Sequence, residues 1–266
     1  MKRKRIALLD TDFISKSFTS CAAADHLIDR VLEFPGLDFC CCHHQITIEL
    51  SHYTGEVSQW LDKMIQDKRV SCYTDEKILD ELEKVYGSYG HHFYIQFLRE
   101  ACAAYGKDYF ATYYADLSSQ QRTDMSREEF LEALSNGDAS IGTKQDLGEL
   151  KTAVLLQVLS NLNDAEMHVF CSDDKNARAG MTQFPNVSCM SILTAFWELK
   201  ELMTKEELRL YYDSFVESLH PTQKGFKVIE ANGTGRLLTI TFEQFFEDLI
   251  LGKMDALGTG MLRYKS

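Results

Sequence analysis

Short apolar runs alternate with longer helical segments along most of this chain, and this rhythm restricts its fold more than any other feature. Runs at 5–10, 38–42, 70–73, 167–171 and 187–192 have the length of strands. Strands that alternate with helices usually pair in parallel, because each helix carries the chain back across the sheet. We therefore predict an α/β fold in which a parallel sheet is flanked by helices in three layers.

The segments between these runs predict the helices. Thr74 or Asp75 can cap a helix that continues through residue 86, and 45–53 either extends the second strand or begins a helix. The segment 145–162 shows a strong amphipathic pattern. The other helices are expected at 23–33, 56–66, 174–183 and 193–203.

Two segments depart from this rhythm. From about 88 to 140, aromatic residues recur at spacings of three and four, which predicts a helical insertion of two or three helices. Their side chains form either a packed core, which we expect, or a platform on which nucleic-acid bases stack. Residues 204–266 form a C-terminal extension, so the predicted organisation is a domain at 1–203 followed by this extension.

The extension has an α+β pattern. An amphipathic helix is expected at 204–218 and a last helix near 242–252. Between them, strands near 226–230 and 236–241 are predicted to form a β-hairpin around Asn232 and Gly233.

Composition indicates an intracellular globular protein. Of the 266 residues, 45% are hydrophobic and 26% are charged, which suits a buried core. The apolar run after the basic N-terminus is too short for a secretory signal, and no run approaches the length of a membrane span. We therefore expect a cytoplasmic protein without a membrane partner.

The cysteines do not indicate a metal site. The chain has 8 cysteines without paired C-x-x-C knuckles, so we expect reduced thiols and no structural zinc. Cys40 to Cys42, followed by His43 and His44, are interpreted as a buried strand in which cysteine acts as a small apolar residue.

The net charge of −12 argues against a broad electrostatic footprint for duplex DNA, although a local basic groove is compatible with it. The basic residues from Lys2 to Arg5 suggest a nucleic-acid patch. They precede the first strand, however, and five strand residues span roughly 17 Å. A solvated terminus is therefore the favoured interpretation of these residues.

Acidic residues occur at the ends of strands and in apolar helical settings. Asp10 ends the first strand, Glu49 follows the second, and Asp146 and Glu149 open a helix. Asp173 and Asp174 follow a later strand. Ligand sites of parallel sheets lie beyond the carboxyl ends of the strands. Clustered carboxylates repel one another unless a cation lies between them, so the set indicates a cation site. Taken singly, each acid has a plain alternative as a helix cap, a turn residue or an exposed first-turn acid.

The ordered set resembles the PIN-domain nuclease family. LLDTDFIS resembles its first motif, with Asp12 where that family usually has Asn, and ITIELSHY resembles the second, around a glutamate. DLGELKTAVLL resembles a variant third motif in which Gly-Glu opens a helix, and FCSDDKNAR resembles the fourth. The resemblance covers about residues 5–75 and 141–200, and the insertion and extension exceed a minimal PIN domain.

The resemblance implies a divalent-metal-dependent nuclease, most of all an endoribonuclease, that uses Mg²⁺ or Mn²⁺. It implies four catalytic acids: Asp10, Glu49, Glu149 and Asp173. The metal ligands would be Asp10, Glu149 and Asp173, with Asp146 and Asp174 as supporting acids and Glu49 bound directly or through water. Thr11, Asp12 and Ser172 would support the site. Lys175 and Arg178 either contact the phosphate backbone of the substrate or are surface charges.

The resemblance also sets expectations about partners. The substrate would be RNA, with single-stranded DNA as the alternative, and a homodimer and an inhibitory protein partner are further expectations. A toxin, a defence nuclease and a processing enzyme all stay open as biological roles.

Two other functions fit parts of the sequence. Asp10-Thr11-Asp12 resembles the nucleophile motif of haloacid dehalogenase-like phosphatases, and Asp173 with Asp174 would then hold Mg²⁺. That interpretation leaves Glu49 and Glu149 without a role. A non-catalytic PIN-like module that binds RNA or protein is the third hypothesis, and retention of all the acids counts against it.

Overall fold

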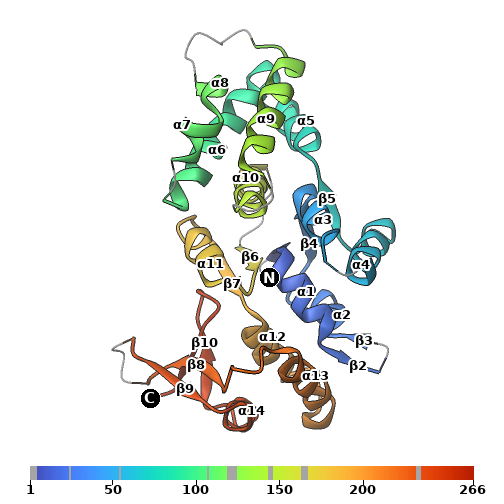
Figure 1. The fold of residues 1–266 in the computed structure, drawn as a ribbon, viewed down its shortest axis with the longest axis vertical. Coiled ribbons are helices and arrows are strands. Elements are labelled where there is room, and N and C mark those ends of the chain that lie inside the picture. Colours follow the sequence, from blue (N-terminus) through green and yellow to red (C-terminus); the bar gives the residue numbers. More distant parts are fainter. Residues whose placement is uncertain are drawn as a thin grey trace. The chain divides into compact units, whose positions relative to one another are not determined.

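The computed structural model describes residues 5–23, 25–53, 55–106, 108–118, 125–142, 146–162, 167–231 and 235–266. Its central feature is a five-stranded parallel sheet flanked by helices, with strand order β5-β4-β1-β6-β7 (Figure 1). The five strands are β1 (Arg5–Leu9), β4 (Phe39–His43), β5 (Ser71–Tyr73), β6 (Met167–Cys171) and β7 (Val187–Met190). The α/β class and the parallel sheet predicted from the sequence are therefore confirmed.

The pairing of strands β1, β4 and β5 explains the cysteine run. Cys40 lies opposite Ala7 of β1, and Cys42 lies opposite Cys72 of β5. Cys40, Cys41 and Cys42 are all buried, and all eight cysteines of the chain are free thiols. The prediction that these residues serve as small apolar side chains in a buried strand is confirmed.

Contacts within the chain define two compact units. The first contains Met1–Thr11 and Phe39–His168, and the second contains Asp12–Asp38 and Val169–Ser266. This grouping differs from a division at residue 203, because residues near both ends of the chain join the second unit. The predicted domain boundary at 203 stays a prediction.

The helices of the first unit include those of the insertion at about 88–140. Segment 45–53 begins with helix α3, and Thr74 caps α5 by accepting a hydrogen bond from the backbone N–H of Lys77. Among the described residues of the insertion there are four helices, α6 to α9, where two or three were expected. The helices are α3 (His44–Leu50), α4 (Gly55–Gln66), α5 (Asp75–Tyr86), α6 (Gly90–Ala104), α7 (Tyr109–Tyr113), α8 (Ala115–Ser118), α9 (Arg127–Ile141) and α10 (Leu147–Leu162).

Helix α10 is buried on nearly every side. Twelve of its residues between Leu147 and Leu159 are buried, including Lys151 and Gln157, and it packs against α3, α5 and α6. A helix at the surface would expose one polar face. The amphipathic prediction for this segment was wrong, because the inserted helices cover the face that would otherwise meet water.

Four aromatic residues of the insertion lie in a packed core. Tyr94, Phe97, Tyr114 and Phe130 are buried, and the rings of Tyr94 and Phe130 meet edge to face at 5.3 Å between centroids. A stacking platform needs ring faces that a base can reach. The packing interpretation therefore holds for these four residues.

The second unit begins with elements that the sequence did not predict. Helix α1 (Thr11–Thr19) follows β1, and a short antiparallel pair, β2 (Cys21–Ala22) and β3 (Asp25–His26), precedes α2 (Leu27–Leu32). The predicted helix at 23–33 is therefore confirmed only in its second part. The remaining helices of this unit are α11 (Lys175–Met181), α12 (Ile192–Leu199), α13 (Lys205–Ser218) and α14 (Phe242–Ile250).

The C-terminal extension folds around a four-stranded sheet in the order β10-β11-β8-β9. Strands β8 (Phe226–Ile229) and β9 (Leu237–Ile240) pair antiparallel, as the predicted hairpin requires, and Asn232 and Gly233 lie outside the described residues. The other two strands, β10 (Met254–Ala256) and β11 (Leu262–Tyr264), were not predicted. Tyr212 of α13 and Phe245 of α14 stack at 6.0 Å between ring centroids in the core of this unit.

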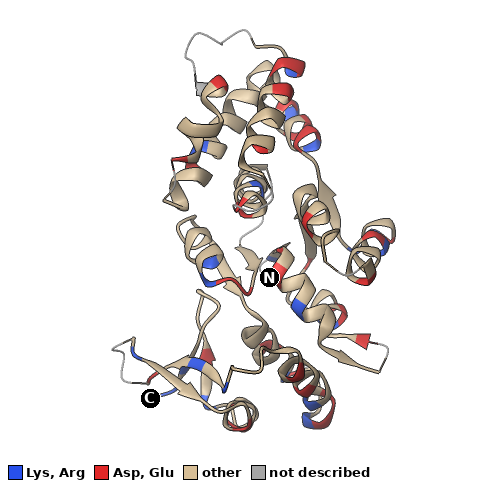
Figure 2. Cartoon of the chain, in the orientation of Figure 1, with Lys and Arg blue, Asp and Glu red and all other residues tan. Residues whose placement is uncertain are grey.

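Charged residues of both signs alternate along single helices. Figure 2 shows acidic and basic residues interleaved on α4, α5 and α13. The net charge of −12 is thus distributed over several elements of each unit. Within the described part of the chain, no helix has both the length and the apolar character needed to span a membrane.

A close backbone approach before β8 generates a stability prediction. A Cβ atom on Gly225 would lie 1.9 Å from the carbonyl oxygen of Ile240, so Gly225→Ala must shift one strand of the hairpin. We expect it to lower the free energy of unfolding by about 1–3 kcal/mol, measured by urea denaturation. Gly258→Ala is the matched control, because a Cβ there meets nothing within 4 Å, and it should change stability by less than about 0.5 kcal/mol. Equal stability of the two variants would contradict this packing.

Candidate functional site

Four carboxylates of the first unit gather at the start of helix α10, and we call them the acid cluster: Asp10, Glu49, Asp146 and Glu149. Asp10 directly follows strand β1 and is only 3% exposed. Glu49 lies near the end of α3, and Asp146 and Glu149 lie at the entrance of α10. Their mutual influence is visible in the pKa of Glu149, which Asp10, Glu49 and Asp146 all raise. The structure thus brings these four predicted site residues together.

Glu49 is held at both carboxylate oxygens. The hydroxyl of Thr11 donates to Oε2 at 2.5 Å, and the side-chain amide of Gln45 donates to Oε1 at 3.4 Å. Thr11 thus contacts the acid cluster, and its supporting role stays a prediction, whereas Gln45 was not singled out in the sequence. These two contacts orient the carboxylate of Glu49 toward α10.

Gly148 makes room for this carboxylate. A Cβ atom at Gly148 would lie 2.7 Å from Oε1 and 2.8 Å from Oε2 of Glu49. Such distances are shorter than carbon and oxygen atoms tolerate, so a larger residue would displace Glu49 or α10. This close approach gives a physical reason for glycine beside Glu149 in the DLGEL segment.

Glu149 is the member of the acid cluster with the strongest electrostatic signature. Burial raises the pKa of its carboxyl, and the negative charge of Asp10, followed by Glu49 and Asp146, raises it further, to about 8. A hydrogen bond from its own backbone N–H opposes these effects only in part. In the absence of a cation, Glu149 therefore carries a proton at neutral pH.

The backbone at Asp146 is unusual. Its φ of 51° lies in the left-handed region, which few residues other than glycine adopt, although aspartate tolerates it better than most. The carbonyl of Asp146 accepts a hydrogen bond from the N–H of Leu150 at 2.9 Å, which forms the first turn of α10. This conformation directs the chain into the helix beside the other acids.

The donor set of the acid cluster suits a hard divalent cation. Carboxylate oxygens are the preferred protein ligands of Mg²⁺ and Mn²⁺, and a cation would relieve the repulsion that raises the pKa of Glu149. Among the described residues, no group of three or more His, Cys, Asp and Glu side chains is arranged to hold a metal ion. Mg²⁺ usually retains several waters and binds through one or two carboxylates, so this geometry fits a partly hydrated ion.

A lysine of helix α1 makes ion pairs with two of the predicted acids of the second unit. Lys16 on α1 contacts Asp173 at 2.8 Å and Asp12 at 3.2 Å. Burial would lower the pKa of Lys16, but the charges of Asp173 and Asp12 outweigh it, and the pKa is raised. Asp173 also accepts a hydrogen bond from the backbone N–H of Ile192 at 3.3 Å. Sequence reasoning missed Lys16, although its position four residues after Asp12 on a helix was a usable signal.

Asp174 and Ser172 serve the start of helix α11. Asp174 caps the helix by accepting from the backbone N–H groups of Asn176 and Ala177. The hydroxyl of Ser172 accepts from the N–H of Asp174 at 3.1 Å, and Ser172 is fully buried. For Asp174, the structure therefore supports the alternative of a helix cap that the sequence left open.

The two basic residues of α11 differ in exposure. Lys175 is exposed, whereas Arg178 is only 8% exposed. The guanidinium of Arg178 donates to the carbonyl oxygens of Ser172 at 2.7 Å and Thr259 at 3.1 Å. Arg178 is thus neither a surface charge nor a group directed at a substrate phosphate, because it holds the segment before β11 against α11.

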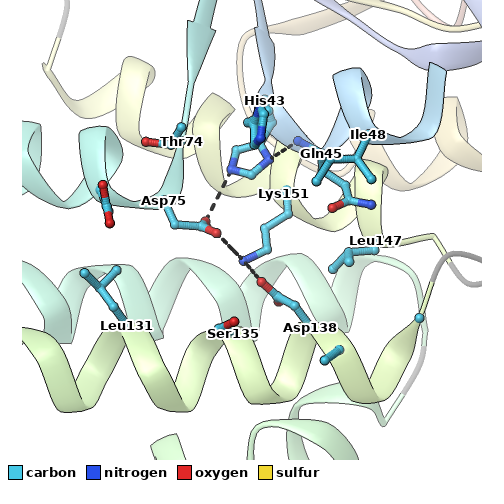
Figure 3. A pocket seen from close by; sticks show the side chains of 14 residues that line it. His43, Gln45, Ile48, Thr74, Asp75, Leu131, Ser135, Asp138, Leu147 and Lys151 are labelled. Atoms are coloured by element: carbon cyan, nitrogen blue, oxygen red, sulfur yellow. Dashed lines mark hydrogen bonds and ion pairs between the residues drawn. The ribbon is translucent and has the colours of Figure 1, made fainter. Parts of the chain in front are cut away.

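A buried ion network in the first unit was not predicted. Lys151 of α10 is 1% exposed, and its ammonium lies 3.0 Å from Asp75 and 2.7 Å from Asp138 (Figure 3). Tyr94 donates to Asp75 and Tyr114 donates to Asp138. We call Lys151, Asp75 and Asp138 the lysine network. The signal that could have revealed it was a lysine in the middle of an otherwise apolar helix.

The two aspartates of the lysine network have pKa values that are shifted in opposite directions. Burial would raise the pKa of Asp75, but Lys151 and His43 outweigh it and hold that pKa well below its ordinary value. Burial raises the pKa of Asp138, with Lys151 opposing it. His43 accepts a hydrogen bond at Nδ1 from the N–H of Gln45, so its proton belongs on Nε2, which lies 3.3 Å from Asp75 (Figure 3).

These residues form the floor of a cavity of about 670 Å³ in the first unit. Its walls come from α3, α9 and α10 and from the start of α5 (Figure 3). Ligand cavities in proteins typically measure about 300–1,000 Å³. The cavity is therefore large enough for an organic molecule.

Comparison of the chain with family models, with curated proteins and with solved structures found no match.

The raised pKa of Glu149 generates a prediction about stability and pH. The folded state holds the Glu149 proton up to a pKa of about 8, against an ordinary value of 4.5, so it binds more protons than the unfolded chain between these values. The stabilisation from this group is complete below 4.5 and is lost as the pH rises through about 8.

We expect Glu149→Gln to remove this loss, so that the stability of the variant relative to the wild type increases from pH 5 to pH 8. Urea denaturation at a series of pH values, without divalent ions, measures the difference. Glu56→Gln, which changes an exposed glutamate of α4, is the control and should follow the wild-type curve. Parallel curves for all three proteins would show that Glu149 ionises like an ordinary glutamate.

Proposed function

We propose that this chain is a divalent-metal-dependent nuclease of the PIN-like kind, acting as an endoribonuclease. The observation that carries the proposal is the acid cluster, in which Asp10 and Glu49 help to raise the pKa of Glu149 to about 8. Buried repulsion of this kind costs stability, and it is a common feature of sites that exchange protons or bind cations. The order of these acids along the chain supports the PIN-like assignment.

Asp10 and Glu149 would hold the cation, with water completing its coordination and the carboxylate of Glu49 beside it. A bound Mg²⁺ or Mn²⁺ ion would supply positive charge for the scissile phosphate and acidify a water molecule. Asp146, at the entrance of α10, would add to the negative potential that attracts the ion. Asp173 has its charge balanced by Lys16 within the second unit, so the proposal does not depend on it as a ligand.

Glu49 is the residue best placed to accept a proton. Thr11 and Gln45 fix its two oxygens, so its carboxylate has a defined orientation toward the other acids. In the proposed reaction, water oxygen bonds to phosphorus, the bond from phosphorus to the leaving oxygen breaks, and Glu49 takes the proton from the water. The leaving oxygen takes a proton from solvent.

The phosphatase alternative gains no support from the position of Asp12. That mechanism uses Asp12 as a proton donor or acceptor, whereas its carboxylate is paired with Lys16 at 3.2 Å. The homodimer and the inhibitory partner implied by the family resemblance stay predictions.

We expect the purified protein to cleave single-stranded or structured RNA in the presence of Mn²⁺ or Mg²⁺, and to lose this activity in EDTA. Asp10→Asn removes a buried carboxylate of the acid cluster and should lower the cleavage rate by about 100-fold or more. Gel analysis of a labelled RNA measures the rate, and circular dichroism establishes that the variant is folded.

Asp62→Asn is the matched control for this assay, because it removes an exposed carboxylate from α4 and should leave cleavage unchanged. A generic phosphate monoester is assayed in parallel. Monoester hydrolysis without RNA cleavage would favour the phosphatase, and RNA binding without any hydrolysis would favour the non-catalytic module. Either outcome would overturn the nuclease proposal.

A further inference from the structure

The cavity above the lysine network adjoins the acid cluster. Gln45 lines the cavity and also donates to Oε1 of Glu49 at 3.4 Å. Ile48 and Leu147 also line the cavity. Ile48 directly precedes Glu49 of the acid cluster, and Leu147 directly precedes Gly148, which lies against the carboxylate of Glu49. A molecule in the cavity would therefore have one end beside the carboxylates that are proposed to act on a phosphate.

The lining of the cavity combines apolar walls with a few polar groups. Ile48, Leu131 and Leu147 supply apolar surface, and Ser135 and Asp138 supply side-chain oxygen atoms (Figure 3). Cavities that bind organic ligands typically have this composition, with apolar surface for affinity and a small number of polar groups for orientation.

The charge of the cavity disfavours a phosphate group inside it. Asp75, Glu76 and Asp138 contribute three acidic side chains, and Lys151 is the lysine among the lining residues. Lys151 already makes ion pairs with both aspartates, so its positive charge is neutralised by side chains of the protein. A neutral group with hydrogen-bond donors fits this environment better than an anion does.

Asp138 can accept a further hydrogen bond. It accepts from the hydroxyl of Tyr114 at 2.6 Å and pairs with Lys151 at 2.7 Å. A carboxylate offers about four acceptor positions, so these contacts leave capacity for a ligand donor. Exocyclic amino groups of bases are donors that aspartate and glutamate recognise.

We propose that this cavity binds one nucleobase of the substrate strand and selects bases that carry an exocyclic amino group. The base would pack against Ile48 and Leu147 and donate to Asp138, while its phosphate would remain outside, beside Glu49. Uracil and thymine carry a carbonyl oxygen in place of the amino group, and this oxygen would repel the carboxylate of Asp138. This assignment rests on the proposed nuclease function, because it treats the acid cluster as the place of phosphate chemistry.

The test uses cytidine, adenosine and uridine as probes and the full-length protein in EDTA, so that binding is measured apart from catalysis. Calorimetry or ligand-observed NMR provides the dissociation constants. We expect saturable binding of cytidine and adenosine, and binding of uridine weaker by about tenfold or more. Equal binding of the three nucleosides, or no saturable binding, would overturn the proposal.

Two variants of α9 locate the binding site. Ala139 lines the cavity and is exposed, so Ala139→Phe fills the cavity without disturbing a buried residue. It should weaken cytidine binding by about tenfold or more. Asn136→Phe places the same side chain at an exposed position of the same helix that does not line the cavity, and it should leave binding within about twofold. Unchanged binding in Ala139→Phe would rule out this cavity as the site.

Cleavage of RNA separates failure of the cavity assignment from failure of the nuclease proposal. Nucleoside binding that is lost in Ala139→Phe, in a protein that cleaves no RNA, would support the cavity and remove the nuclease. RNA cleavage with a base preference that Ala139→Phe leaves unchanged would support the nuclease and remove the cavity as its base site.

Discussion

Helix α10 places two ionisable side chains, Lys151 and Glu149, in the interior of the first unit, and the neighbouring elements supply different partners for each. Its residues from Leu147 to Leu159 are almost all buried, among them Lys151, and Glu149 is half-buried two residues earlier. Successive residues of a helix are rotated by about 100°. Glu149 and Lys151 are two positions apart, so their side chains point to nearly opposite sides of α10. Each therefore requires its own set of partners.

The lysine is neutralised by the protein itself. Asp75 from the start of α5 and Asp138 from α9 both reach Lys151, which ties the inserted helices to α10. Removing one member of a buried ion network leaves an uncompensated charge, so the network also fixes which helices can pack here. The walls of the adjoining cavity are a consequence of this arrangement, since α9 and α10 are held around the same three residues.

The glutamate lies in a different electrostatic setting. Burial and the carboxylates of Asp10, Glu49 and Asp146 act in the same direction on its pKa and raise it. Carboxylates that together raise the pKa of a buried acid are the arrangement expected for a site that binds a cation from solution.

The sequence predicted the sheet and the acids of the cluster because both depend on local pattern. Strand β6 was predicted at its observed bounds, and Asp10, Glu49 and Glu149 were singled out by their positions at the ends and starts of elements. The partners of Lys151 could not be predicted, because Asp75 lies 76 residues from Lys151 in the chain and only tertiary packing joins them. Arg178 was misjudged for the same reason, since its partner Thr259 lies 81 residues away.

The most direct test of the acid cluster as a cation site is the number of protons released when Mn²⁺ binds. Calorimetric titrations at pH 7 in two buffers of different ionisation enthalpy give this number. Because the pKa of Glu149 is about 8, binding should release nearly one proton, and Glu149→Gln should abolish the release. Mn²⁺ binding without proton release, or no Mn²⁺ binding to the folded protein, would contradict this account of the site.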